Sequence, residues 1–386
     1  MNTRKLYYED CHLKTFTATV TGCRQDPLGW LITLDATAFY PEGGGQACDL
    51  GTLGEARVLD VQEREDEILH LCDRPLPVGT AVAGNLDWER RFDLMQQHSG
   101  EHILSGLVNQ AYGFHNAGFH VGRGAMEIDF DGIIPAEDIP ALEERANRVI
   151  WENLPIHCHI PDPDTLSKTP YRTKRSLPWP VRLVQIPDTD SCACCGVHVA
   201  ATGEIGLLKI LSCVKFRQGV RLELVCGKRA WDYLQQVFHQ NRQVSQLLSA
   251  KPLETGEAAK KLQEALAAEK FRCAGLQKQV FTGIAKDYVN QSNVLHFASP
   301  LEPGQVRELA DGIAQVCTGW AAVFSPREGG FHYCLASRDG DLRQLGKDMT
   351  AALNGRGGGK PNFQQGTLTA GEAEIRAFFE KENDHG

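Results

Sequence analysis

Two histidines, His98 and His102, lie four residues apart in the segment QQHSGEHILS. On a helix, this spacing places both imidazoles on one face, close enough to share a cation. An HxxxH pair alone is weak evidence, because two unrelated surface histidines often meet the same spacing. The pair predicts a metal site only if further ligands come from another segment.

A second group of potential ligands lies in the segment DSCACCGVHV, which contains Cys192, Cys194, Cys195 and His198. Such a density of thiols and imidazole is unusual outside metal sites. Two histidines from the first segment, with one thiolate and the histidine of the second, would give three nitrogens and one sulfur, a set typical of zinc. The two segments together therefore predict one zinc ion per chain. Either cysteine could bind, because Cys194 precedes His198 by four residues and Cys195 by three; a cysteine that does not bind is a small buried hydrophobe.

A third segment, TAFYPEGGGQACDLG, contains three consecutive glycines, Gly43, Gly44 and Gly45, followed by Gln46. Such a run lets the backbone approach a ligand closely and offer N–H groups to an anionic or carbonyl oxygen. A tight turn between two strands is the plainer interpretation of the glycines by themselves.

Positive charge is concentrated between residues 165 and 185, although the whole chain has a formal net charge of −9. The overall balance gives no general attraction to nucleic acid, so an RNA site must be a local patch. Tyr171 and Trp179 alternate there with basic residues, a combination that suits base stacking and phosphate contact. A solvated basic loop is the alternative. The candidate RNA-binding residues of this segment are Lys168, Arg172, Lys174 and Arg175.

Elements of different kinds must position these residues, and we predict a multidomain α+β protein. Residues 1–90 carry short alternating apolar runs between turn residues, which predicts an N-terminal β-barrel or sandwich. Residues 91–238 mix helical and strand patterns and form a central α+β domain that holds the zinc site. Residues 239–280, rich in Gln, Ala, Lys, Glu and Leu, are typical of a long helix or helical hairpin. Residues 281–386 alternate strand-like and helical runs, which predicts a separate small α/β domain.

The cellular compartment can be predicted from apolar runs and cysteines. No segment approaches the roughly 20 apolar residues that a membrane span requires, and the N-terminus has no signal-peptide pattern. The 13 cysteines are odd in number, and several are isolated, which argues against a disulfide framework. We therefore expect a cytoplasmic protein with reduced thiols and no membrane association.

These motifs occur together, in this order, in the AlaX-type alanyl-tRNA editing proteins, and the chain resembles the long form of that family along essentially its whole length. The family itself resembles the editing and C-terminal parts of alanyl-tRNA synthetase. Its usual text CGGTHV reads CCGVHV here, so the resemblance assigns the ligand position to Cys194 and gives Cys195 no role. The family motifs are FYPEGGGQ at 39–46, HxxxH at 98–102, CxxxH at 194–198, TGEIG at 202–206 and GGGKP at 357–361.

The resemblance implies an editing hydrolase that acts on alanine tRNA charged in error with serine, and it leaves glycine as a second candidate. A synthetase pocket shaped for alanine rejects smaller glycine and hydroxyl-bearing serine poorly, so a second hydrolytic site must supply the remaining accuracy. No synthetase activation domain precedes residue 1, and we expect deacylation without charging.

The resemblance also implies where substrate and RNA bind. No residue beyond the metal site receives a catalytic role, and we interpret Glu101 as structural, because it points away from the adjacent ligand His102 on a helix. The loop from Gly355 to Gly366 would contact RNA phosphates through Arg356 and Lys360. The helical or C-terminal region would mediate a homodimer. The implied substrate pocket comprises Gly43, Gly44, Gly45, Gln46 and Asn116, the last aligning with a threonine of relatives that helps to admit serine.

Two other functions fit parts of the sequence. HSGEH also matches HxxEH, a zinc peptidase signature with Glu101 as base, but a thiolate and a fourth protein ligand leave little room for the peptidase water. A zinc-stabilised RNA-binding or synthetase-associated protein without catalysis is the other alternative.

Overall fold

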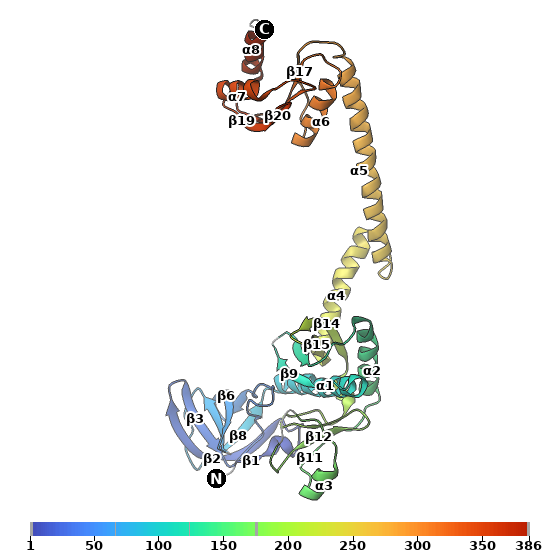
Figure 1. Ribbon diagram of the computed structural model, residues 1–386. Coiled ribbons are helices and arrows are strands. Elements are labelled where there is room, and N and C mark those ends of the chain that lie inside the picture. Colours follow the sequence, from blue (N-terminus) through green and yellow to red (C-terminus); the bar gives the residue numbers. More distant parts are fainter. Residues whose placement is uncertain (1–2, 66, 123, 174–176, 384–386) are drawn as a thin grey trace. The chain divides into compact units, whose positions relative to one another are not determined.

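The computed structural model describes residues 3–65, 67–122, 124–173 and 177–383 (Figure 1). The chain divides into two compact units, Met1–Gln243 and Val244–Gly386. The division falls inside helix α4 (Gly227–Leu247), which begins ahead of the predicted helical segment at residue 239. A second helix, α5 (Thr255–Lys286), follows. The predicted mixture of helices and several sheets is confirmed.

The first unit begins with short strands that pair in a ring. β1 (Arg4–Lys5) pairs in parallel with β4 (Ala36–Thr37), and the short helix η1 (Leu6–Tyr8) follows β1. The ring strands are β2 (Thr15–Asp26), β3 (Gly29–Leu34), β5 (Gly51–Leu53), β6 (Ala56–Arg64), β7 (Glu67–Cys72) and β8 (Ala81–Leu86). Their pairing order β2-β3-β7-β6-β5-β8 closes on itself as a barrel. Alternate residues of β2, Phe16, Ala18 and Val20, face its core, as a period of two requires.

One long helix links the barrel to the rest of the unit. α1 (Trp88–Tyr112) starts where the Asp87 side chain accepts a hydrogen bond from the Arg90 backbone N–H, and it ends at Gly113, whose φ is 71°. It packs against a four-stranded antiparallel sheet in the order β14-β15-β10-β9. The sheet strands are β9 (Asn116–Val121), β10 (Met126–Phe130), β14 (Leu208–Phe216) and β15 (Gly219–Cys226).

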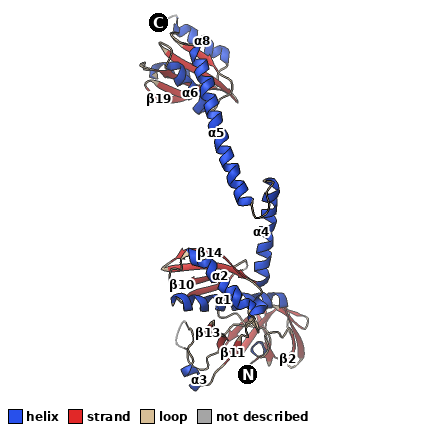
Figure 2. Ribbon diagram, turned by 90° about the vertical axis from the view of Figure 1, so that its right-hand side faces the viewer, coloured by secondary structure: helices blue, strands red, loops and turns tan. Residues whose placement is uncertain are grey.

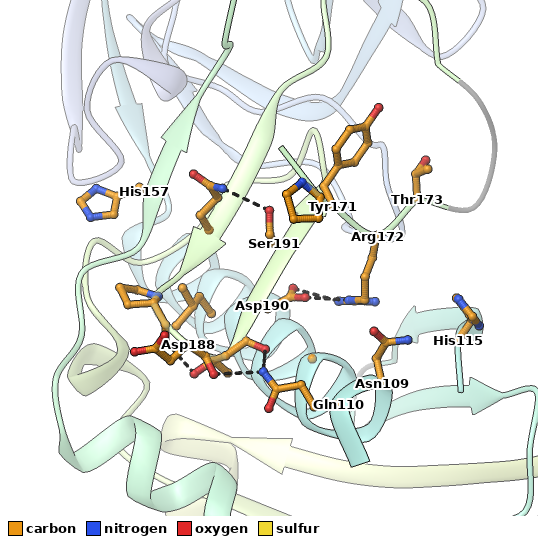
Figure 3. A pocket seen from close by; sticks show the side chains of 16 residues that line it. Asn109, Gln110, His115, His157, Tyr171, Arg172, Thr173, Asp188, Asp190 and Ser191 are labelled. Carbon is orange, nitrogen blue, oxygen red and sulfur yellow. Dashed lines mark hydrogen bonds and ion pairs between the residues drawn. The ribbon is translucent and has the colours of Figure 1, made fainter. Parts of the chain in front are cut away.

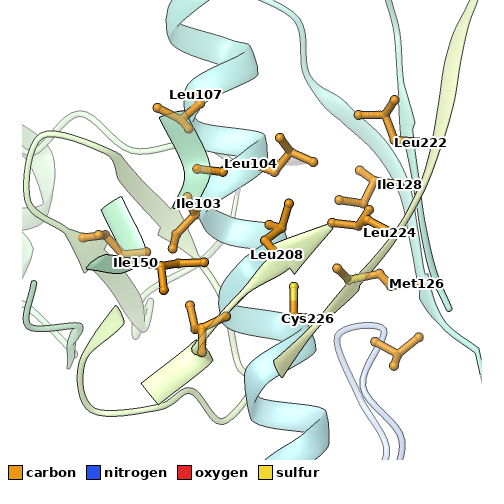
Figure 4. Close-up of a cluster of buried hydrophobic side chains, with 14 of the residues drawn as sticks. Ile103, Leu104, Leu107, Met126, Ile128, Ile150, Leu208, Leu222, Leu224 and Cys226 are labelled. Atoms are coloured by element: carbon orange, nitrogen blue, oxygen red, sulfur yellow. The ribbon is translucent and has the colours of Figure 1, made fainter. Parts of the chain in front are cut away.

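The core of this region lies between α1 and the sheet (Figure 4). Ile103, Leu104 and Leu107 of α1 face Leu208 and Leu222 of the sheet, all buried. α2 (Ile139–Trp151), preceded by η2 (Ala136–Asp138), packs beside α1 (Figure 2). Because α1 is covered on several sides, polar residues along it are buried too.

A three-stranded sheet covers another side of α1. It consists of β11 (His157–His159), β12 (Leu183–Ile186) and β13 (Asp190–Ala193) in sequence order, all antiparallel. α3 (Pro163–Lys168) lies between β11 and β12 in the chain, and η3 (Thr202–Ile205) follows β13. The end of β13 therefore leads directly into the CxxxH motif.

The second unit is a five-stranded sheet with buried clusters on both faces. The strands are β16 (Val294–Phe297), β17 (Trp320–Arg327), β18 (Gly330–Ser337), β19 (Arg356–Lys360) and β20 (Phe363–Leu368), in the order β16-β17-β18-β20-β19. Ala321 and Val323 pack with α6 (Pro303–Ala314), while Ala322 and Phe324 pack with α7 (Arg343–Ala352) and α8 (Glu372–Asn383). The prediction of a loop from Gly355 to Gly366 was wrong, because this glycine-rich segment forms the β19–β20 hairpin.

Among the residues that the structure describes, every helix is too short or too polar to cross a membrane.

A buried ion pair fastens the barrel to α1. Arg91 is 0% exposed, and its Nε lies 2.9 Å from both carboxylate oxygens of Asp49, which precedes β5. Asp49 also accepts a hydrogen bond from the Tyr40 backbone N–H at 2.6 Å, and Arg91 Nη2 donates to the Ala38 carbonyl. Neither charge is accessible to water, so each depends on the other.

We expect Asp49→Ala to destabilise the first unit by about 3–5 kcal/mol, because it leaves a guanidinium buried without its partner. Urea unfolding followed by tryptophan fluorescence measures this. Asp73→Ala is the matched control, since Asp73 pairs with a largely exposed Arg57 and should cost at most about 1 kcal/mol. Equal losses for the two variants would contradict the role of the buried pair.

The barrel also contains a buried histidine, His70, that should make the stability of the fold depend on pH. His70 is 0% exposed; its Nδ1 lies 3.1 Å from the Ile32 carbonyl and its Nε2 lies 2.8 Å from the Thr37 hydroxyl. Burial lowers the pKa of His70 to about 4. The unfolded chain therefore binds a proton here below about pH 6.5 while the folded chain stays neutral, so stability falls as the pH falls from 6.5 toward 4.

Relative to His70→Leu, the wild-type protein should lose about 2 kcal/mol more stability between pH 7.5 and pH 5. Urea midpoints of both proteins at the two pH values measure this, and the comparison removes the contribution of the carboxylates that both share. Parallel pH profiles would show that His70 is protonated equally in both states.

Candidate metal centre

The structure brings together the four predicted ligands. His98 and His102 lie on one face of α1, with ring centroids 5.4 Å apart. The segment after β13 places the His198 ring 4.5 Å from that of His98 and 4.6 Å from that of His102. Cys194 Sγ lies 3.4 Å from His98 Nε2, and one potential ligand atom from each of the four residues lies within 4.8 Å of the others.

Each histidine of the group is held through its Nδ1 atom. Gln46 Oε1 lies 2.8 Å from His98 Nδ1 and Asp190 Oδ2 lies 2.9 Å from His102 Nδ1. The Ser99 hydroxyl lies 3.2 Å from His198 Nδ1. These contacts leave Nε2 of each ring for the centre, which is how outer residues orient metal-ligating histidines.

The polar atoms at the centre fit a cation. His198 Nε2 is fully buried and has no hydrogen-bond partner among the residues that the structure describes, an arrangement that costs free energy unless something occupies the space beside it. Three imidazole nitrogens and one thiolate match the ligand preference and number of zinc. The residues therefore fit the ion that the motifs predict.

At Cys194 and His198, the electrostatics favour the protonation states that a metal requires. Burial opposes ionisation of Cys194, but the neighbouring imidazoles of His98, His102 and His198 outweigh it and hold the pKa of the thiol well below its usual range. Burial and the nearby His98 also hold the pKa of His198 well below its usual range. A thiolate and a neutral imidazole are the forms that bind metal.

His102 differs from the other two histidines in its surroundings. Burial would lower its pKa, but its hydrogen bonds to Asp190 and Cys194 raise the pKa well above the usual value. Asp190 is itself ion-paired with Arg172, whose Nε lies 2.6 Å from Oδ1. The chain Arg172, Asp190, His102 therefore fixes one ring from outside the centre.

A cavity of about 680 Å³ is lined by three of the four candidate ligands, His98, His102 and Cys194. Glu101 and Asn116 line it too. A second cavity, of about 830 Å³, is lined by both members of the Arg172–Asp190 pair (Figure 3). His115, Arg172 and Thr173 line both cavities.

The glycine-rich segment reaches the metal centre mainly through Gln46. A bridge between Gly43 and Gln46 closes a tight turn, in which Gly44 and Gly45 have φ of 60° and 82°. Of the three glycines, Gly44 lines the smaller cavity, and a Cβ there would lie 3.0 Å from Cys195 Sγ. Gln46 is turned toward His98 and also accepts from the Val197 backbone N–H at 3.3 Å, so it orients a ligand histidine instead of lining the cavity.

Asn116 lies at the cavity in contact with Glu101. Its Nδ2 donates to Glu101 Oε1 at 2.6 Å, and the Ser105 hydroxyl donates to the same oxygen. The Asn116 Oδ1 atom is buried and has no hydrogen-bond partner in the described part of the chain. Glu101 is therefore part of the cavity wall as well as a structural residue, a placement that helical spacing alone did not predict.

The predicted RNA-binding residues differ in their exposure to solvent. Arg172 is largely buried and is directed to Asp190 by two hydrogen bonds, and its contact with RNA stays a prediction. Lys168 is exposed at the end of α3, and Arg356 and Lys360 are exposed on the edge strand β19. Lys174 and Arg175 lie outside the described residues.

Sequence reasoning missed the residues that hold the histidines, above all Asp190 and Ser99. A signal existed for each, since Asp190 begins the cysteine-rich segment and Ser99 lies inside HSGEH. Only their pairing with particular rings required the fold.

Two protein-family models match the segments that carry these motifs. The family model described as the threonyl and alanyl tRNA synthetase second additional domain matches residues 181–222, and the model described as class II (A) tRNA synthetases matches residues 6–90. The first match contains the CxxxH motif and the second contains the glycine-rich segment.

Two kinds of relatives match most of the chain. It is 29% identical to alanyl-tRNA editing protein Aarsd1-B of Xenopus laevis, over 96% of this chain and 93% of that protein. It is 33% identical to an alanine–tRNA ligase of Thermofilum pendens, over 95% of this chain but only 42% of the ligase. A solved C-Ala domain of Aquifex aeolicus alanyl-tRNA synthetase aligns with 24% of this chain and 92% of that domain, at 18% identity and a TM-score of 0.22.

The close approach of the CxxxH segment to α1 predicts that Gly196 cannot carry a side chain. A Cβ there would lie 2.1 Å from Cε1 of His98 and 2.4 Å from its Nδ1. We expect Gly196→Ala to cost about 1–3 kcal/mol of stability through overpacking, measured by urea unfolding. Gly124→Ala is the control, because a Cβ at Gly124 meets nothing within 4 Å. An unchanged midpoint for Gly196→Ala would contradict the packing of this loop on His98.

Proposed function

This chain belongs with the AlaX-type alanyl-tRNA editing proteins, relatives of alanyl-tRNA synthetase, and on that premise we propose that it hydrolyses mischarged alanine tRNA. Water adds to the ester carbonyl carbon, the bond from that carbon to the terminal ribose oxygen breaks, and free amino acid and uncharged tRNA leave. The observation that carries the proposal is the cavity whose wall holds His98, His102 and Cys194, with His198 beside them.

We propose that the four ligand residues hold one zinc ion. When bound, the ion would supply Lewis-acid polarisation or orientation of the ester. The chain itself holds the imidazoles in place through Gln46, Ser99 and Asp190, and keeps Cys194 ionised through its histidine neighbours. A set of four protein ligands is typical of a closed site, so we propose that one of them yields its place when substrate arrives.

Asn116 supports serine as the amino acid removed. Its Oδ1 is a buried acceptor that no other described residue bonds to, and Asn116 lines the cavity that would receive the aminoacyl group. The hydroxyl of serine can donate to such an acceptor, whereas alanine and glycine have no hydroxyl. A site with a buried polar group awaiting a hydroxyl discriminates against substrates that lack one.

The second unit is proposed to contact the RNA. Strand β19 is the edge of its sheet, and Arg356 and Lys360 flank three glycines whose backbone is exposed. Backbone N–H groups beside two cations suit phosphate oxygens. The exposed apolar residues of α5, which include Leu262, Leu266 and Leu276, support the separate proposal that this helix pairs with a second copy.

Replacing Cys194 tests the zinc ion and the activity together. We expect Cys194→Ala to lower the amount of bound zinc by about 100-fold or more. We expect the same fall in kcat/KM for alanine tRNA that is charged with serine. The measurements are metal content after dialysis and release of labelled serine, with alanine-charged tRNA as a second substrate. Cys195→Ala is the matched control, because Cys195 is exposed and lies outside the ligand set.

The outcomes separate the enzyme from its alternatives. A variant that keeps its fold and its RNA binding but loses hydrolysis supports the proposal. A wild-type protein that binds zinc but releases no serine would overturn it in favour of a zinc-stabilised RNA-binding protein.

A further inference from the structure

The mouth of the smaller cavity carries exposed apolar side chains. Ile160 is 54% exposed and Trp179 is 57% exposed. The Trp179 Nε1–H donates to the Pro161 carbonyl at 3.3 Å, which joins the ring to the segment that carries Ile160. We call Ile160, Trp179 and the two prolines beside the tryptophan, Pro178 and Pro180, the mouth patch.

The mouth patch is continuous with the cavity of the metal centre. Ile160, Pro178 and Pro180 all line that cavity, as His98, His102 and Cys194 do. Trp179 does not line the cavity itself but lies in the chain between the two prolines that do. Exposing a large aromatic ring to water is unfavourable, and such patches commonly mark binding sites. The hydrogen bond from Nε1 to the Pro161 carbonyl restrains the orientation of the indole ring, and a large part of the ring remains exposed to solvent.

The covalent structure of the proposed substrate decides what should lie on this patch. The scissile ester is attached to the ribose of the last nucleotide, so the base of that nucleotide must lie within one nucleoside of the ester carbonyl. An aminoacyl group placed at the ligands therefore leaves its terminal base near the cavity mouth. The only part of the substrate with a flat apolar face at that distance is this base.

We propose that the mouth patch, with Trp179 as its central residue, stacks on the 3′-terminal adenine of the aminoacylated RNA. This inference rests on the proposed function, and it names a substrate contact that the proposed function needs. Stacking on an aromatic ring is tolerant of base identity. The patch would therefore position the 3′ end that all tRNAs share, and selection of alanine tRNA must come from other surfaces.

The charges near the patch suit a nucleotide. Arg182 lines the same cavity, and its guanidinium donates to the carbonyls of Cys194 and Gly196 and lies over the ring of Tyr8. Its positive charge is thus fixed beside the metal centre, where it favours an approaching polyanion. The side chain is held by its own contacts, so we assign base contact to Trp179 and only general attraction to Arg182.

Trp179→Ala tests the proposal with two independent measurements. The first is deacylation of seryl-tRNA, where we expect KM to rise about five-fold or more while the rate at saturating enzyme stays within about two-fold. The second is quenching of tryptophan fluorescence by the trinucleotide CCA, which we expect Trp179→Ala to reduce strongly. Trp179→Phe should restore most of the KM, because phenylalanine retains a stacking face.

Trp151→Ala is the matched control. Trp151 is 66% exposed at the end of α2, and its neighbours in the chain line neither cavity, whereas both neighbours of Trp179 line the smaller one. Its loss should therefore leave KM and CCA quenching unchanged. Unchanged melting temperatures for both alanine variants would show that the fold is intact.

Three results would overturn the inference. They are an unaltered KM for Trp179→Ala, an equal effect of Trp151→Ala, or a loss confined to the saturating rate, which would place Trp179 in the chemistry and not in base binding. If the wild-type protein hydrolyses no seryl-tRNA, the proposed function fails, and CCA quenching alone then decides whether the patch binds a nucleotide end.

Discussion

The structure of the first unit depends on gathering three buried imidazoles and one partly buried thiol around a common centre. His98, His102 and His198 are each 2% exposed, and unpaired nitrogens at such depth are costly. The arrangement persists because each ring is fixed on its outer side by a different element. Gln46 comes from the loop between barrel strands, Asp190 from β13 and Ser99 from α1 itself. The centre therefore requires three segments to be assembled correctly at once.

That requirement explains the position of the barrel. The barrel contributes no ligand, yet its glycine-rich turn delivers Gln46 to His98, and the Asp49–Arg91 pair fixes the same loop region to α1. The positive φ values of Gly44 and Gly45 let the turn pass close to Cys195 and Phe119, where a Cβ would collide with a side chain. The glycines thus serve the approach of one segment to another. The interpretation of the motif as a tight turn is confirmed, and the approach of its backbone to a ligand stays a prediction.

The arrangement of the two cavities relates chemistry to substrate size. The smaller cavity is lined by His98, His102 and Cys194 and by the exposed Ile160, so it can receive an amino acid and the nucleoside that bears it. Arg172 lines both cavities, and its partner Asp190 lines the larger one. Asp190 bonds to both Arg172 and His102. A shift of Arg172 would therefore change the position of the His102 ring.

The sequence alone determined the chemistry of this protein, because ligand residues are specified by type and by local spacing. Four residues between His98 and His102 put two rings on one helical face, and CCGVHV supplied a thiol and a third ring; both statements need only helix geometry and metal preference. Apolar alternation likewise predicted the N-terminal strands, and apolar periodicity predicted the long helices. Helix limits were less well predicted, since α4 begins inside a segment whose pattern is still that of the central domain. What only the tertiary structure decided were contacts between distant segments. Gln46 bonds to a candidate ligand histidine, Arg172 is paired with Asp190, the glycines near residue 357 form an edge strand, and the Trp179 ring bonds to the Pro161 carbonyl. Such contacts depend on where the chain returns in space, and local spacing carries no information about that return.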